Sequence, residues 1–375
     1  MIRTTHVGSL PRSKPVTDII FAKERGERVD LKEADRILAQ AVEACVAKQV
    51  KVGIDQVSDG EMSKISYATY ISERISGFEG DSPRRAPADL EAFPKFLARQ
   101  AERGGTPEYR RPCCVGEVGS VNLAPLEDDI QRFDEAKAKH GSPEGFMNAA
   151  SPGVIALFQP NEYYHDEDAY LEAVAEAMRP EYEQIVDAGL MLQLDSPDLG
   201  LGRHMMFKNQ EDSEYVRTVD RHVEVLNHAL RNISAEKLRM HVCWGNYEGP
   251  HTHDVAMETI LPSIMKAKPA ALLFETSNPR HQHDYEAFAD FAKYIPEDKM
   301  LIPGCIDTTT NFVEHPRVVA NRIGQFVNIV GKDRVVAGTD CGFSTFAGFG
   351  TIDEDIVWAK LSSLVEGAAI ASARV

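Results

Sequence analysis

The stretch LRMHVCWGNYEGPHTHDVAMETILPSIMKAKPAALLFE, residues 238–275, decides the fold. It begins with a short apolar run that ends at Cys243, continues with a helical period over His253–Lys266, and closes with a second apolar run, Ala271–Glu275. Short apolar runs that alternate with amphipathic helices are typical of β/α units around a parallel sheet. We therefore predict a strand, a helix and a second, parallel strand in this stretch.

The same alternation extends through the chain in both directions. It predicts eight strands, at Thr4–Leu10, Ile54–Ser58, Gly153–Phe158, Leu190–Asp195, Leu238–Cys243, Ala271–Glu275, Met300–Cys305 and Val335–Thr339. It predicts amphipathic helices at Leu31–Lys51, Asp166–Ala188, Tyr215–Asn232, His253–Lys266, His283–Tyr294, His315–Val330 and Asp353–Ala373. Eight such units in a chain of this length favour an α/β fold of the (β/α)8 TIM-barrel type, as a single barrel over residues 1–375. The sequence contains no GxGxxG motif, the glycine-rich turn that would favour a doubly wound sheet instead.

One region departs from the alternation. Gly80–Glu117 is rich in Pro, Arg and Gly, and its end, CCVGEV from Cys113, resembles a ninth strand. No linker-like composition marks its edges as those of a separate domain. We interpret residues 80–120 as an insertion, a hairpin excursion over the mouth of the barrel.

Composition excludes several classes of function. The 375 residues carry 58 acidic and 41 basic side chains, a net charge of -17, and such a surface repels nucleic acid and anionic membranes. The sequence has no apolar run of about 18 residues, and its N-terminus lacks the layout of a signal peptide. We expect a cytoplasmic protein with no nucleic-acid or membrane partner, and self-association into a homo-oligomer stays open.

A set of soft and hard metal ligands follows the predicted strands. His241 and Cys243 alternate on one strand and therefore point to the same face. Glu275 ends the next strand and Cys341 follows the last, so a barrel would bring all four to one rim. Two thiolates, an imidazole and a carboxylate suit Zn²⁺ with an exchangeable position. We predict a catalytic zinc site that binds and ionises a small thiol, against the alternatives of a structural zinc site and of a buried pair without metal.

The other four cysteines are assigned to packing. Cys305 precedes the polar turn of its strand and is interpreted as an apolar residue of the rim. Cys45 lies within a helical pattern, and Cys113 and Cys114 would point to opposite faces of a strand. Six scattered cysteines in a chain of this length do not form a disulfide framework, so we expect reduced thiols.

Two further polar residues are candidates for catalysis. His251 follows a Gly-Pro break and has the context of a loop residue, but such a loop could place it above the metal as a general acid for the leaving group. Asp307 follows the strand at Met300–Cys305 and is either an acid that caps a turn or a contact to the heteroaromatic ring of a donor molecule that would react with the thiol. We carry both as catalytic candidates.

These residues also carry a resemblance to a known family. His241-Val-Cys243, Glu275 and Asp340-Cys341-Gly342 resemble the zinc-ligand motifs in the catalytic barrel of the cobalamin-independent methionine synthases. Similar to that family's other signatures are Thr4-Thr-His-Val-Gly-Ser-Leu-Pro-Arg12, Asp59-Gly-Glu61 and Gln193-Leu-Asp195-Ser-Pro197. The resemblance implies zinc-dependent transfer of a methyl group to homocysteine, as in methionine biosynthesis.

The resemblance also assigns the residues that would bind the thiol substrate. It implies that the backbone of Gly8 and Ser9 meets the homocysteine carboxylate. It implies that Glu61 and Asp195 meet the amino group, and paired acids suit an ammonium.

The methyl donor is less well defined. By this resemblance we expect the chain to correspond to the catalytic half of the long two-barrel members, without their N-terminal barrel. Where those members have a histidine after a Gly-x-x-Asp turn, this chain reads Gly304-Cys-Ile-Asp307-Thr-Thr-Thr310. The segment after Cys341 is also altered, and its Phe346 and Phe349 could line an apolar pocket.

Two alternative functions remain. The epoxyalkane:coenzyme M transferases, a sister group, resemble this chain in the HVCWG of residues 241–245 and in Val313-Glu-His-Pro316. They apply the same zinc–thiol chemistry to an epoxide and a sulfonated thiol. The second alternative is a non-catalytic zinc- or thiol-binding barrel, because a fold does not guarantee its usual activity.

Overall fold

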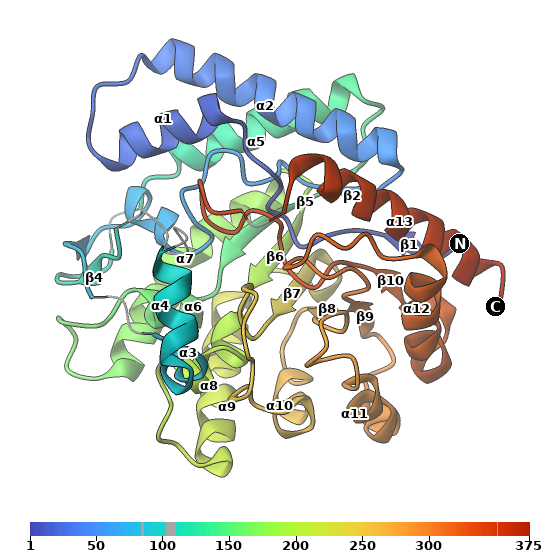
Figure 1. The fold of residues 1–375 in the computed structure, drawn as a ribbon. Coiled ribbons are helices and arrows are strands. Elements are labelled where there is room, and N and C mark those ends of the chain that lie inside the picture. Colours follow the sequence, from blue (N-terminus) through green and yellow to red (C-terminus); the bar gives the residue numbers. More distant parts are fainter. Residues whose placement is uncertain (84–85, 103–109, 120, 351) are drawn as a thin grey trace.

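The computed structural model describes residues 1–375 except 84–85, 103–109, 120 and 351. Parallel strands form its centre and helices surround them (Figure 1). Within the described residues, the central strands are β1 (Arg3–Thr4), β2 (Gln56–Val57), β5 (Glu144–Ala150), β6 (Met191–Asp195), β7 (Leu238–Val242), β8 (Ala271–Phe274), β9 (Met300–Pro303) and β10 (Val336–Ala337).

Backbone pairing follows the strands around a closed circle. One parallel sheet has the order β2-β5-β6-β7-β8-β9, and β1 pairs with β10 in parallel. Single bridges between Leu301 and Val335 and between Gly304 and Gly338 join β9 to β10. The Asp55 N–H donates to the Thr4 carbonyl at 3.2 Å and joins β1 to β2. The prediction of a (β/α)8 barrel is therefore confirmed.

Helices cover the outside of this barrel and connect its strands. The long ones are α1 (Lys14–Glu24), α2 (Leu31–Val52), α5 (Ala124–Lys139), α7 (Glu167–Asp187), α9 (Asp212–Ala229), α12 (Pro316–Val330) and α13 (Glu354–Ser372). The shorter ones are α6 (Pro152–Phe158), α8 (Gly202–Met205), α10 (Met257–Ile264) and α11 (Tyr285–Asp290). The two termini lie side by side (Figure 1), and the Ile2 N–H donates to Ser372 Oγ at 2.7 Å.

One predicted strand is wrong. Gly153–Phe158 forms most of α6, a helix whose residues are all buried, and the strand at this place is β5. Periodicity cannot separate a short buried helix from a buried strand. Here the cap decides, because Ser151 accepts a hydrogen bond from the Val154 N–H and Pro152 occupies the first turn.

The first predicted strand is shorter than expected. Regular pairing covers only β1, and beyond it the chain leaves the sheet to approach the loop after β2, where the Leu10 N–H donates to the Gly60 carbonyl at 3.2 Å. The Val7 N–H donates to Thr339 Oγ1 at 3.2 Å. These contacts carry residues 7–10 across the end of the barrel.

A short antiparallel pair flanks the segment that the sequence analysis interprets as an insertion. β3 (Phe78–Glu79) pairs with β4 (Cys113–Cys114), and α3 (Ala88–Ala92) and α4 (Pro94–Glu102) lie between them in sequence. Asp89 of α3 is fully buried and accepts hydrogen bonds from the N–H groups of Thr252 and His253, each at 2.8 Å. Since those residues belong to the connection after β7, α3 rests at the end of the barrel where the strands finish.

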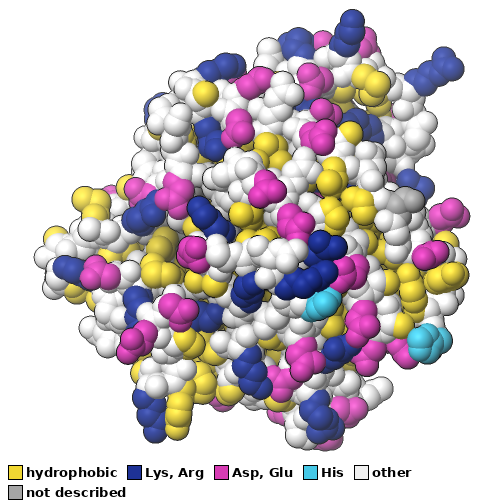
Figure 2. Space-filling model, turned by 180° about the vertical axis from the view of Figure 1, so that it is seen from behind, with side chains coloured by type: hydrophobic (Ala, Val, Ile, Leu, Met, Phe, Trp, Pro, Cys, Tyr) yellow, Lys and Arg dark blue, Asp and Glu magenta, His cyan; other side chains and the backbone are white. Residues whose placement is uncertain are grey.

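The barrel interior contains both apolar and charged side chains: Arg239 of β7 is fully buried there and donates hydrogen bonds to Gln193 Oε1 at 2.8 Å and to Thr5 Oγ1 at 2.9 Å. Val7, Leu273, Ile302 and Val336 belong to an apolar cluster on strands and loops of the barrel. Acidic and basic side chains are interspersed on the face that Figure 2 shows, so the net charge is not gathered there in one patch. Among the described helices, none combines the length and apolar character that crossing a membrane requires.

Candidate active site

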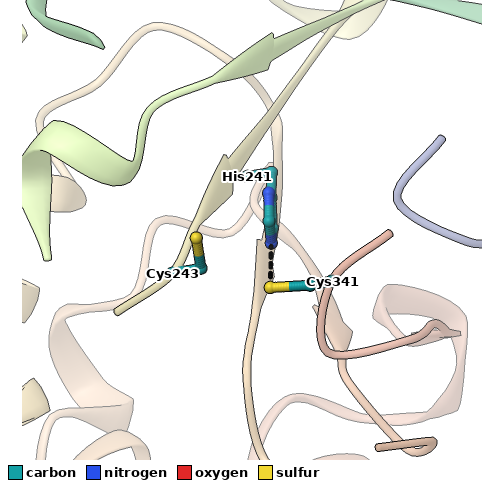
Figure 3. A group of neighbouring side chains, drawn as sticks. All are labelled: His241, Cys243 and Cys341. Carbon is teal, nitrogen blue, oxygen red and sulfur yellow. Dashed lines mark hydrogen bonds between the residues drawn. The ribbon is translucent and has the colours of Figure 1, made fainter. Parts of the chain in front are cut away.

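Three ligand-type side chains converge where the strands end. His241 lies in β7, Cys243 follows it two residues later, and Cys341 comes from the loop after β10 (Figure 3). One ligand atom of each lies within 4.8 Å of the others, and His241 Nε2 is 3.9 Å from Cys341 Sγ. All three are at least nine-tenths buried. The alternation along β7 therefore places its imidazole and thiol as the sequence predicts.

Glu275 lies at the edge of this group. It directly follows β8, and its Oε1 is 3.8 Å from Cys341 Sγ. The same oxygen accepts the Trp244 N–H at 2.8 Å, and Oε2 accepts the Asn278 side-chain amide. Burial raises the pKa of Glu275 above its ordinary value. The structure thus places the fourth predicted ligand beside Cys341, held by hydrogen bonds of its own, while the group whose ligand atoms all lie within 4.8 Å of one another contains the other three.

Asp340 organises the loops around these residues, a role that sequence reasoning did not give it. Its carboxylate accepts the N–H groups of Thr276, Ser277 and Asn278, each at 2.9 Å. Its carbonyl lies 3.0 Å from His241 Nε2. Asp340 therefore ties the loop after β8 to the loop that carries Cys341. The sequence did contain a signal for this role, because Asp340 directly precedes Cys341 at the end of a predicted strand.

The residues present fit a soft divalent metal. The hydrogen bond with Cys243, followed by burial, raises the pKa of Cys341 well above its ordinary value, and burial lowers the pKa of His241. A lowered pKa favours the neutral imidazole, which is the form that binds metal, and two buried thiols face it. Two sulfurs, a neutral imidazole and a nearby carboxylate form a donor set that suits Zn²⁺.

Glu61 is a buried acid with an unusual environment. Its side chain has one oxygen, Oε2, with no hydrogen-bond partner, and its backbone has a φ of 56°. Burial raises its pKa to about 8, and the charge of Asp195 adds to the effect while Lys64 opposes it. A non-glycine residue at positive φ and an unpaired buried acid both cost free energy, and such costs concentrate at functional sites.

Asp195 lies between Glu61 and the ligand group. Its Oδ1 is 3.8 Å from His241 Nδ1, and its carboxylate accepts hydrogen bonds from Asn148 and Gln193. Burial raises its pKa, and the charge of His241 opposes this. Sequence reasoning missed Asn148 because it lies on β5, the strand that was assigned to the wrong residues.

Gly8 lies against the side chain of Asn148, and Ser9 follows it in the chain. Gly8 has a φ of 144°, and a Cβ at this position would lie 2.4 Å from Asn148 Oδ1, so only glycine fits. Ser9 Oγ accepts a hydrogen bond from the Ser344 N–H at 3.4 Å, and Ser9 lines the same pocket as His241 and Cys341. The structure thus gathers the four predicted substrate-binding residues around one end of the barrel.

A pocket of about 240 Å³ joins these groups. Its polar end includes Ser9, Glu61, Asp195, His241, Cys243 and Cys341. The rest of its lining is largely apolar and aromatic, with Tyr67, Leu90, Phe158, Met205, Phe346 and Phe349 among its residues. Asn246, which the sequence did not single out, also lines it and donates to the Gly342 carbonyl at 2.7 Å.

The structure does not bring the two catalytic candidates into this pocket. His251 uses both ring nitrogens, Nδ1 with Asp254 at 2.9 Å and Nε2 with the Tyr247 carbonyl at 3.1 Å. Burial lowers its pKa, but the bond and charge of Asp254 outweigh this and the net pKa is raised. The Asp307 carboxylate accepts hydrogen bonds from Thr309 and Thr310, the geometry of an acid that caps a turn. Neither residue is among the described residues of the pocket lining.

Comparison with known proteins places this geometry in a family. Residues 151–368 match the family described as the catalytic domain of cobalamin-independent synthase. This chain belongs to that family. The methionine synthase of Saccharolobus solfataricus is 27% identical over 374 residues, covering 98% of this chain and 94% of that protein. That of Sulfurisphaera tokodaii is 24% identical, covering 99% of this chain and 92% of that protein.

Solved structures show the same fold. The B12-independent methionine synthase from Shewanella sp. W3-18-1, in complex with selenomethionine, aligns with a TM-score of 0.75 and 17% identity, over 100% of this chain and 98% of that chain. A putative vitamin-B12 independent methionine synthase from Listeria monocytogenes aligns with a TM-score of 0.69 and 20% identity, over 99% of this chain and 98% of that chain.

Proposed function

We propose that this chain is a zinc-dependent enzyme that transfers a methyl group to the sulfur of homocysteine, acting as a single catalytic barrel. One observation carries the proposal: a single pocket is lined both by His241, Cys243 and Cys341 and by the acids Glu61 and Asp195. Soft ligands suit a sulfur, and paired buried acids suit an ammonium. Homocysteine has both groups. Membership of the family and likeness to methionine synthases support the same substrate.

In this proposal His241, Cys243, Glu275 and Cys341 hold Zn²⁺, which would lower the pKa of the substrate thiol to near neutrality. Glu61 and Asp195 bind the ammonium, and the unpaired Glu61 Oε2 is the acceptor that it would meet. The backbone at Gly8 and Ser9 faces the carboxylate. Fixing both ends of the amino acid in this way aligns its sulfur for attack on the methyl carbon.

Serine substitutions test the ligand assignment. Cys243→Ser and Cys341→Ser should each lose bound zinc and activity, because a serine hydroxyl does not replace a thiolate toward this ion. Metal content per chain is measured by atomic emission, and homocysteine consumption by thiol titration. Cys305→Ser is the matched control, since Cys305 is also fully buried but lies outside the group. Full zinc occupancy in either ligand variant would refute the assignment.

The alternative functions are separated by choice of substrate. Coenzyme M carries a sulfonate and no ammonium, so the buried acids Glu61 and Asp195 of the pocket would have no positive group to pair with. Thiol consumption with homocysteine and with coenzyme M, each with methyl donors and with an epoxide, distinguishes the two reactions. A protein that binds zinc and thiol but alkylates neither would be a binding barrel.

A further inference from the structure

A second cluster of ligand-type side chains lies at the same end of the barrel. His251 and Asp254 belong to the connection after β7, and His281 belongs to the connection after β8. One ligand-type atom of each lies within 4.8 Å of those of the other two, and all three side chains are at least nine-tenths buried. None of the three is among the described residues that line the pocket. The cluster is therefore distinct from the group formed by His241 and the two cysteines.

Asp254 is the centre of this cluster. Its Oδ2 lies 2.9 Å from His251 Nδ1 and 3.0 Å from His281 Nε2. The other nitrogen of His251 faces the Tyr247 carbonyl at 3.1 Å, and that of His281 faces Asp284 Oδ2 at 2.8 Å. A ring nitrogen that faces an acceptor has to carry a proton. Each of the two rings therefore holds two protons and a positive charge.

The pKa values agree with this charge. Burial lowers the pKa of His281, but the hydrogen bonds with Asp254 and Asp284 outweigh burial and raise the pKa to about 10. Burial raises the pKa of Asp254, but hydrogen bonds from the two histidines bring it below its ordinary value. The net pKa of His251 is raised as well. Near neutral pH the cluster thus holds two imidazolium charges beside one buried carboxylate.

The protons on these rings leave two buried atoms unsatisfied. Asp254 Oδ1 has no hydrogen-bond partner among the described residues. His204 Nε2 lies 3.5 Å from it but faces the Trp244 carbonyl at 3.1 Å. His204 Nδ1 is also without a partner there, 3.5 Å from Asp89 Oδ2. Unpaired buried polar atoms cost free energy, and a bound ion is one of the reasons for which they persist.

We propose that His251, Asp254 and His281 bind a divalent transition-metal cation such as Zn²⁺, at a second site that has no sulfur ligand. The ion takes the place of one proton on His251 Nδ1 and one on His281 Nε2. One doubly charged ion enters and two protons leave, so the net charge of the cluster is unchanged. Imidazole nitrogens with a carboxylate suit this class of ion, whereas Mg²⁺ and Ca²⁺ take oxygen ligands.

The spacing of the ligand atoms is close to what such an ion requires. Bonds from Zn²⁺ to nitrogen and oxygen are about 2.1 Å long, so tetrahedral ligand atoms lie about 3.4 Å apart. The two contacts of Asp254 Oδ2 are 2.9 and 3.0 Å. Side-chain shifts of about 0.5 Å therefore convert the hydrogen-bonded arrangement into a coordinated one.

An ion at this site supports the catalytic rim and does not touch the thiol substrate. It joins the connections after β7 and β8. The ring of Trp244 lies 4.2 Å from that of His281, centroid to centroid, and the Trp244 N–H donates to Glu275 at 2.8 Å. The second site thus fixes the loops that hold Glu275. It is independent of which group the enzyme transfers.

Cobalt(II) tests the site because it reports its ligands in the absorption spectrum. Chelator-treated protein would be loaded with Co²⁺ and its metal content measured. The wild type should bind two equivalents, and a chain with both Cys243→Ser and Cys341→Ser should bind one, without thiolate-to-cobalt charge-transfer absorption. Calorimetry of this double variant in buffers of different ionisation enthalpy should show release of about two protons per ion. A folded double variant that takes up no ion, or takes up Mg²⁺ equally well, would overturn the inference.

His281→Gln identifies the ligands in the otherwise wild-type chain. This variant should lose one equivalent of Co²⁺ and keep the thiolate absorption. His283→Gln is the matched control, because His283 is two residues away and 66% exposed. Two equivalents in His281→Gln, or a single equivalent in the wild type, would contradict the second site even if the double variant does not fold. Loss of the thiolate absorption from the wild type would instead contradict the ligand set of the proposed function.

Discussion

The two ends of the pocket differ in how they are held. At the polar end, Glu61 has a positive φ and an unpaired buried oxygen, and its neighbour Asp195 has a raised pKa. At the apolar end, aromatic rings pack against one another and Asp89 satisfies the backbone of the loop beneath α3. The polar end therefore lowers the free energy of unfolding, and the apolar end raises it.

This difference separates two tasks. Residues that bind the thiol substrate should gain stability when they are neutralised and lose binding, since their strain and buried charge serve the ligand. Residues that support the apolar wall should lose stability when they are removed, with less effect on thiol binding. Substitutions at each end of the pocket test whether ligand binding and stability are separated in this way.

Glu61→Gln should have the largest effect. The substitution removes the carboxyl group that would meet the ammonium of the amino acid, and the loss of such a buried partner costs about 3 kcal/mol, so the affinity for methionine should fall about 100-fold. The free energy of unfolding should stay equal or rise, because a buried unpaired acid disappears. Calorimetry and urea unfolding measure the two quantities, with the exposed Glu79→Gln as control. A variant that loses stability and keeps its affinity would make Glu61 a structural residue.

Asp89→Ala should show the opposite signature. It removes the acceptor for two backbone N–H groups and for the Tyr247 hydroxyl, and we expect a loss of about 2 kcal/mol in the free energy of unfolding. Methionine affinity, measured by calorimetry, should change far less than it does in Glu61→Gln. Glu91→Gln on the exposed side of the same helix is the control. A loss of methionine affinity as large as that in Glu61→Gln would show that α3 supports the whole pocket.

The contrast also explains which parts of the site the sequence could predict. His241, Glu275 and Asp195 end apolar runs, and parallel strands in a barrel finish at one rim, so their meeting follows from pattern and topology. Asn148 was not predicted as a site residue because its strand was not recognised. β5 contains Gly145 and alanines, which do not favour strands, while the apolar run of α6 has the composition of a strand. The position of Leu90 depends on hydrogen bonds between Asp89 and residues more than 150 positions away, for which the sequence has no periodic signal.

The pH dependence of stability should report the buried acid directly. The pKa of Glu61 in the folded state is about 8, above its ordinary value of 4.5, so the folded state binds more protons between these values. Stability from this residue is therefore fully present below pH 4.5 and is lost as the pH rises through 8. One proton corresponds to a slope of at most about 1.4 kcal/mol per pH unit. Urea unfolding of metal-free protein at several pH values should show a shallower decline for Glu61→Gln than for the wild type, and parallel curves would contradict the assignment.

His251 should have the smallest effect, although the sequence made it a candidate general acid. Both its nitrogens are engaged by Asp254 and the Tyr247 carbonyl, so no ring proton is directed at the pocket. His251→Asn suits the backbone φ of 49° and keeps a polar side chain near Asp254. We expect a change in methyl-transfer rate below about threefold, whereas loss of a general acid would cost about 100-fold or more. A loss of that size, with stability and methionine affinity intact, would mean that this loop moves during turnover and that His251 reaches the leaving group.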